Sequence, residues 1–200
     1  MLINAIFFAN VLAQLGVSIE FSQAETRIQI QGEAAAQTGE ASALEPITYH
    51  VGGTVISEPL TIYYIYYGAW SAAQKAVIKT FTDGLGASDW WGMSTKYYAL
   101  NNGKTFVTSS ITYGKDVDDN YSMGKQLTGG STQKIVQSKL NDGSLPYDIN
   151  GIYFLLTSKD VSESSGPSNT FCANYCGYHA PRFTPSGQPI LIAMAGVIFI

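Results

Sequence analysis

Runs of consecutive apolar residues, rather than regular alternation with polar ones, mark the predicted strands of this chain. Leu60–Tyr67 contains almost only β-branched and aromatic residues, and Gly151–Thr157 is a second run of similar character. Strands without polar alternation are typical of sheets that are covered on both faces. Both runs therefore predict interior strands of one sheet.

Amphipathic stretches between these runs predict helices. Ala72–Gly84 follows Ser71, whose hydroxyl suits an N-cap, and Ser131–Asn141 carries apolar residues at helical spacing. A shorter helix is expected to begin at Trp90, and a further strand at Thr105–Tyr113. The resulting order of strands and helices predicts an α/β layered domain with a mixed, mostly parallel sheet flanked by helices.

An acidic segment follows the strand at Thr105–Tyr113, and Asp116–Asn120 is predicted to be a loop. Asp116, Asp118 and Asp119 could together bind a cation. The glycine and the distal glutamate of a calcium-binding loop are absent, however, so a solvated acidic loop is the favoured interpretation.

The N-terminal part divides into two segments. Met1–Gly16 is apolar and has no charged side chain, which suggests a signal peptide spanning residues 1–24, with cleavage after Ala24. No Lys or Arg precedes the apolar run, so an amphipathic or core helix is the alternative. Residues 25–46 have no aromatic side chain and are expected to be a flexible leader to a domain at 47–200.

Composition excludes some functions. Apolar residues make up 46% and charged residues 13% of the chain, which indicates a globular domain. The net charge of −4 argues against nucleic-acid binding. Lys and Arg form no run that would bind an anionic membrane surface. The apolar run from Ile190 is too short to span a bilayer. The 13 Tyr suit either a sugar-binding surface or the edge of a core.

The two cysteines, Cys172 and Cys176, are four residues apart, and His179 follows closely. In a secreted chain this spacing favours a disulfide. A metal site formed by Cys172, Cys176 and His179 is an alternative, but His50 is the only other histidine and the spacing matches no common zinc motif. A redox function is disfavoured, because three residues rather than two separate the cysteines. No cofactor is predicted.

Two further features suggest an extracellular role. Asn120 begins an Asn-Tyr-Ser sequence, which would accept an N-linked glycan if the chain is secreted. The pair Trp90-Trp91 is expected to pack its short helix against the core, and a sugar-stacking platform is the alternative. The candidate ligand contacts are His50, Trp70, Trp90, Trp91 and His179.

Six short blocks occur in a fixed order along the chain. They are Tyr49-His50-x-Gly52, Ile62–Trp70 with Ala73-Gln74, Asp89-Trp90-Trp91, Tyr121–Thr128, Gly151–Val161 and Phe171-Cys-x-x-x-Cys-Gly-Tyr-His179. This series resembles the EXORDIUM family, also called the phosphate-induced protein family.

The resemblance implies a secreted protein of the cell wall or apoplast, involved in growth and in hormone or nutrient responses. It brings no assigned enzymatic reaction, and it suggests cell-wall polysaccharide or an extracellular protein as partner. Met123 stands where the family has a histidine. Family members continue into a helix beginning His-Glu-Leu-Ala-Glu, as in zincin metalloproteases, and this chain has no His-Glu pair. We therefore interpret the sequence as part of a longer protein.

Three hypotheses follow for the function. The first, which we prefer, is a non-catalytic secreted protein of the cell wall. The second is a truncated, inactive fragment of a zincin-like, metal-dependent hydrolase, for which the chain offers only two histidines. The third is a carbohydrate-binding module.

Overall fold

The computed structural model describes residues 55–100, 102–166, 169–171, 173–175 and 177–196. The predicted signal peptide at 1–24 and leader at 25–46 lie outside the described residues. So do three candidate site residues, His50, Cys172 and Cys176, and therefore the predicted disulfide.

One mixed sheet forms the centre of the molecule. Its elements and the smaller ones around it are β1 (Leu60–Tyr67), α3 (Ala72–Leu85), α4 (Asp89–Ser94), β2 (Tyr98–Leu100), β3 (Lys104–Phe106), β4 (Ile111–Asp119), β5 (Gln126–Thr128), α5 (Ser131–Asn141), β6 (Gly151–Thr157), β7 (Ser162–Ser164), β8 (Gly177–Phe183) and β9 (Pro189–Gly196).

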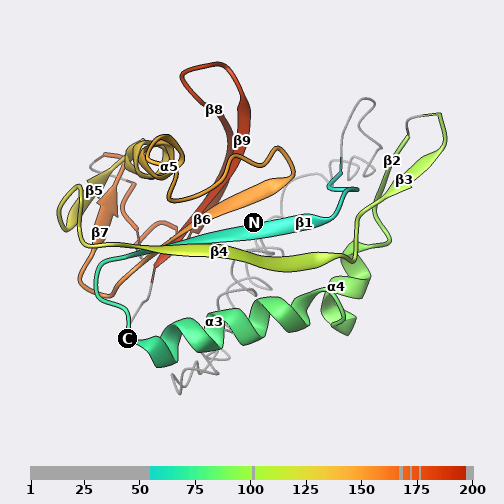
Figure 1. Ribbon diagram of the computed structural model, residues 1–200, viewed down its shortest axis with the longest axis horizontal. Helices are drawn as coiled ribbons and strands as arrows, with labels where there is room; N and C mark the ends of the chain where they lie inside the picture. The colour runs from blue at the N-terminus through green and yellow to red at the C-terminus, as the bar shows by residue number, and fades with distance from the viewer. Residues whose placement is uncertain (1–54, 101, 167–168, 172, 176, 197–200) are drawn as a thin grey trace, which may run out of the picture.

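In the described part of the chain the central sheet has the order β4-β1-β6-β9-β8 (Figure 1). The first four strands are parallel, and β8 pairs with β9 in the antiparallel direction. The predicted α/β fold with a mixed, mostly parallel sheet is therefore confirmed.

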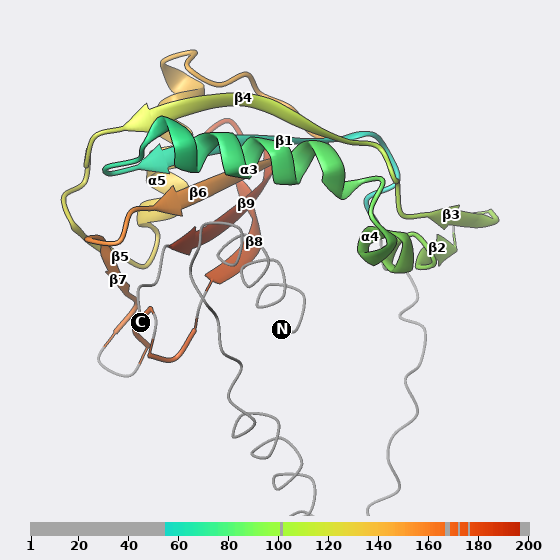
Figure 2. The same cartoon turned by 90° about the horizontal axis from the view of Figure 1, so that it is seen from below.

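The two longer helices lie on opposite sides of this sheet (Figures 1 and 2). Two hydrophobic clusters lie on the two faces. Tyr64 of β1 belongs to one of them with Ile78 of α3, and Ile65 of β1 belongs to the other with Ile135 of α5. Alternate side chains of a strand point to opposite faces, so β1 must be apolar on both. This explains why Leu60–Tyr67 shows no polar alternation.

The predicted strand at Thr105–Tyr113 is wrong in its boundaries. Residues 104–106 form β3, which pairs with β2 in a small hairpin, and β4 begins only at Ile111. The acidic loop predicted at Asp116–Asn120 is also wrong, because β4 runs to Asp119. Parallel pairing with β1 extends the strand through these aspartates, with Tyr67 opposite Asp119.

The apolar segment near the end of the chain forms a buried strand, β9. Ile190, Ile192 and Met194 of β9 are each at most 2% exposed and pack on the α5 side of the sheet. Among the described helices, none has the length and apolar character needed to cross a bilayer.

Buried tyrosines predict that the protein loses stability in alkali. Burial raises the pKa of Tyr66, Tyr153 and Tyr178 to about 12 each. The unfolded chain ionises its tyrosines near pH 10, so between about pH 10 and 12 it binds fewer protons than the folded protein. Ionisation of these tyrosines should therefore leave the free energy of unfolding unchanged below about pH 10 and should lower it above that pH.

Denaturant titrations at several pH values check this expectation. Tyr66→Phe should reduce the alkaline loss of stability, whereas Tyr97→Phe, which changes a side chain that is 70% exposed, should not. An equal pH dependence in wild type and Tyr66→Phe would contradict the assignment.

Candidate functional site

The carboxyl ends of the central parallel strands are joined closely. The amide of Gly68 donates to the carbonyl of Asp119 at 2.8 Å, and the amide of Ser158 donates to the carbonyl of Tyr67 at 2.9 Å. From β1 the chain continues toward β4, and from β6 it continues toward β9, so the strand order reverses between β1 and β6. Ligands of open α/β sheets bind at such a point, outside the carboxyl ends of the strands.

A pocket of about 720 Å³ lies at this position, and we call it the carboxyl-edge pocket. Its walls come from the segment that joins β1 to α3, from the end of β4, and from the residues after β6. The lining residues are Gly68, Ala69, Trp70, Ser71, Gln74, Asp118, Asn120, Ser158, Lys159 and Asp160.

Trp70 is held firmly in the wall of this pocket. Its indole Nε1 donates to the carbonyl of Tyr67 at 3.2 Å, and its ring lies 5.2 Å from the ring of Tyr66. Ser71 then caps α3, because its hydroxyl accepts from the amide of Gln74 while the Gln74 side chain accepts from the Ser71 amide. The sequence prediction of Ser71 as N-cap is confirmed.

Asp160 is fixed by three partners. Lys125 Nζ lies 2.7 Å from its carboxylate, the Ser158 hydroxyl donates to it at 2.6 Å, and the Tyr121 hydroxyl donates at 2.8 Å. The hydrogen bonds from Lys125, Ser158 and Tyr121 hold the pKa of Asp160 well below its usual range. This wall of the pocket thus keeps its negative charge in mildly acidic surroundings.

The aspartates that end β4 have separate partners. The Tyr113 hydroxyl donates to Asp116 at 2.6 Å, and Asp118 pairs with Lys75. Asp119 is buried and forms a salt bridge with Lys139 of α5, with 3.0 Å between Lys139 Nζ and Asp119 Oδ2. The three carboxylates therefore serve different contacts rather than one shared site.

Asn120 follows β4 directly and is exposed at the carboxyl-edge pocket. In the described part of the chain no hydrogen bond engages its side chain, whereas Asp119 accepts from the amide and the hydroxyl of Ser122. The amide of Asn120 is thus accessible both to a ligand and to a glycosylating enzyme.

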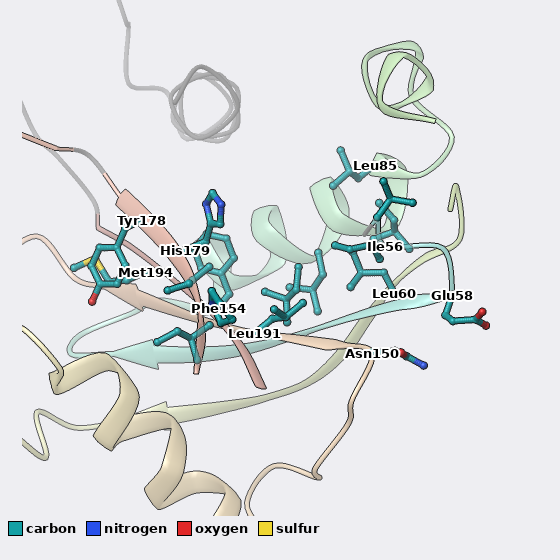
Figure 3. A pocket seen from close by; sticks show the side chains of 18 of the residues that line it. Ile56, Glu58, Leu60, Leu85, Asn150, Phe154, Tyr178, His179, Leu191 and Met194 are labelled. Carbon is teal, nitrogen blue, oxygen red and sulfur yellow. The ribbon is translucent and has the colours of Figure 1, made fainter. Parts of the chain in front are cut away.

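A second cavity, of about 630 Å³, lies on the α3 side of the sheet, and we call it the apolar groove. Figure 3 shows Leu60, Phe154 and Leu191 along its floor, with Leu85 on the far side and His179 at the β8 end. Trp90 and Trp91 of α4 also line it, and the Trp91 indole donates to the carbonyl of Thr108 at 2.8 Å.

The structure divides the candidate ligand contacts between these two cavities. Trp70 lines the carboxyl-edge pocket, whereas Trp90, Trp91 and His179 line the apolar groove. The three tryptophans therefore do not form one platform. Within the described ranges, no three His, Cys, Asp or Glu side chains gather in a way that could hold a metal ion.

Sequence reasoning missed the polar residues that complete the carboxyl-edge pocket, above all Ser158 and Asp160. Their position directly after the buried run Gly151–Thr157 is the signal that could have identified them, because residues at the carboxyl ends of parallel strands meet at one edge.

Sequence reasoning also missed Glu163, a buried carboxylate in β7 that is 1% exposed. Its carboxylate accepts hydrogen bonds from the hydroxyls of Tyr175 and Tyr178, and Tyr178 also donates to Thr132 of α5 at 2.8 Å. This network anchors the loop before β8 to the α5 side of the sheet, which gives Glu163 a structural role.

Comparison with known proteins gives a consistent picture. Residues 47–197 match the model of the phosphate-induced protein 1 conserved region. The chain is 32% identical to EXORDIUM-like 5 of Arabidopsis thaliana over 70% of its own length and 39% of that relative's, and 32% identical to EXORDIUM-like 3 of the same plant over 70% and 42%. It is 31% identical to PHOSPHATE-INDUCED 1 of Nicotiana tabacum, over 66% and 41%. The chain thus spans about two fifths of these relatives. No solved structure matches it.

Proposed function

Because the chain belongs to the phosphate-induced protein 1 family and is similar to EXORDIUM-like proteins, we propose that it is a secreted, non-catalytic protein of the cell wall or apoplast. In this role it would act in growth and in the response to hormones or nutrients. The family match over residues 47–197 is the observation that carries the proposal.

Two features of the chain support an extracellular location. The first is the uncharged apolar sequence at Met1–Gly16, which suits a signal peptide. The second is the position of Asn120, which is exposed in the turn after β4 and begins an Asn-Tyr-Ser acceptor sequence. A glycosylation enzyme can reach this asparagine without unfolding the sheet.

Expression of the tagged chain in plant cells tests the proposal. We expect the full chain to reach the apoplastic fluid with its N-terminus cleaved after Ala24, because residues 1–24 direct export. A variant without residues 1–24 should stay inside the cells. The measurements are immunoblots of apoplastic and cellular fractions, and N-terminal sequencing of the mature protein.

The same material tests glycosylation and the growth role. Treatment with a glycosidase should lower the apparent mass of the exported wild type but not that of Asn120→Gln. Plants that express the exported form should grow more than plants that express the variant without residues 1–24. Protein that retains Met1 and stays inside the cells would overturn the proposal.

A further inference from the structure

The carboxyl-edge pocket combines an immobile aromatic ring with unengaged amide groups. Trp70 is fixed by its hydrogen bond to Tyr67 and by the adjacent ring of Tyr66. Fixing the ring before a ligand arrives lowers the entropy that binding costs. An aromatic face suits the C–H groups of a sugar ring, as it suits other amphipathic ligands.

The polar groups around Trp70 can both donate and accept hydrogen bonds. Within the described residues, the Asn120 side chain has no partner, and the Gln74 side chain uses only its Oε1, which accepts from Ser71. The amide NH₂ of Gln74 therefore remains for a ligand, and so does the Asn120 amide in protein that carries no glycan there. Hydroxyl groups, which donate and accept, match such amides better than a purely anionic or cationic ligand does.

The charges of the pocket do not favour an anion. Two carboxylates, Asp118 and Asp160, line it together with the ammonium group of Lys159. Both carboxylates already have lysine partners, Lys75 and Lys125, so their oxygens can accept from hydroxyls without requiring a cationic ligand. The balance suits a polar ligand without net charge.

From this arrangement we propose that the carboxyl-edge pocket binds a neutral sugar unit of a polysaccharide, with Trp70 under the ring and Asn120 and Gln74 on its hydroxyls. This deepens the proposed function and relies on it for the source of the ligand, a cell-wall polysaccharide. The volume of about 720 Å³ lies within the range of small-molecule sites and leaves room for a short oligosaccharide.

Calorimetric titration of the purified protein, produced without residues 1–24 in a bacterial host that adds no N-linked glycan, tests the proposal. The probes are cellotetraose, a neutral xyloglucan oligosaccharide and an oligogalacturonide, which carries carboxylates. We expect saturable binding of at least one neutral probe and weaker binding of the oligogalacturonide. Because this measurement uses purified protein, its outcome is independent of whether the protein is exported.

Variants locate the binding. Trp70→Ala should weaken the affinity for the neutral probe by about tenfold or more, as truncation of an aromatic anchor usually does. Trp90→Ala is the matched control, since Trp90 lines the apolar groove instead, and it should bind like wild type. Asn120→Ala should weaken binding severalfold, and it changes an exposed side chain that no internal hydrogen bond holds.

Any one of the following results would overturn the proposal. They are no binding of any neutral probe by the folded wild type, unchanged affinity in both Trp70→Ala and Asn120→Ala, or tighter binding of the oligogalacturonide than of the neutral probes. A loss of affinity in Trp90→Ala alone would move the sugar site to the apolar groove and would equally contradict it.

Discussion

Gly68→Ala is expected to lower the free energy of unfolding by about 3 kcal/mol, because two unfavourable effects coincide at this position. Gly68 has a φ of +95°, which residues with a side chain rarely adopt. A Cβ at this position would also lie 2.0 Å from the Ser158 hydroxyl and 3.0 Å from the Tyr121 ring. The methyl group would therefore push apart the strand ends that form the carboxyl-edge pocket. Denaturant unfolding of the purified variant measures the effect.

Gly124→Ala is the matched control. Gly124 has a φ of +79°, but a Cβ there would meet no atom within 4 Å, so only the backbone strain remains. We expect a loss of about 1 kcal/mol for this variant. If both alanine variants lost the same free energy of unfolding, the close approach of Gly68 to Ser158 would not contribute to the loss in Gly68→Ala.

Lys139→Met is expected to destabilise the protein by about 3 kcal/mol, because it leaves the buried carboxylate of Asp119 without its cation. The Asp119 side chain is 0% exposed and that of Lys139 is 15% exposed. Ser122 still donates two hydrogen bonds to Asp119 in the variant, but neither supplies a positive charge. Methionine keeps the apolar stem of lysine, so the loss reports mainly on the charge. Denaturant unfolding again measures it.

Two comparisons separate this effect from a general loss of charge. Lys79→Met breaks an exposed pair with Asp83 on α3, and we expect a change below about 0.5 kcal/mol. The double variant Asp119→Asn with Lys139→Met should recover part of the stability lost in Lys139→Met, because no charge is then left buried. A double variant less stable than Lys139→Met would show that the uncompensated charge is not the cause.

The interior strands and the longer helices could be predicted from the sequence because their signals are local. Leu60–Tyr67 is buried on both faces, and this alone requires a continuous apolar run. Ser131–Asn141 was predicted with the boundaries that the structure shows, since its apolar spacing is helical. In such segments the local sequence is enough to indicate both the secondary structure and the burial.

Segments whose environment is supplied by distant residues could not be predicted in this way. Asp116–Asp119 is locally acidic and indicated a loop, but pairing with β1 makes it part of a strand. Glu163 lies between two serines and gives no sign of burial; it is buried because β5, Tyr175 and Tyr178 surround it.

The candidate site illustrates the same limit. Trp70 was selected for its aromatic ring alone, and Asn120 for its glycosylation sequence. That both line one pocket with Asp160 depends on the order of β4, β1 and β6 in the sheet, which brings together residues up to 90 positions apart. The residue types were visible in the sequence, whereas their convergence required the topology.

The outermost strands of the described sheet bear on self-association. β4 exposes the charged residues Lys115 and Asp116 along one border, and β8 carries Pro181 and Arg182 along the other. Charges and proline hinder the addition of a foreign strand, since a proline offers no N–H for pairing and a charged side chain loses water when a second strand covers it. These two borders of the described sheet therefore disfavour edgewise polymerisation through added strands.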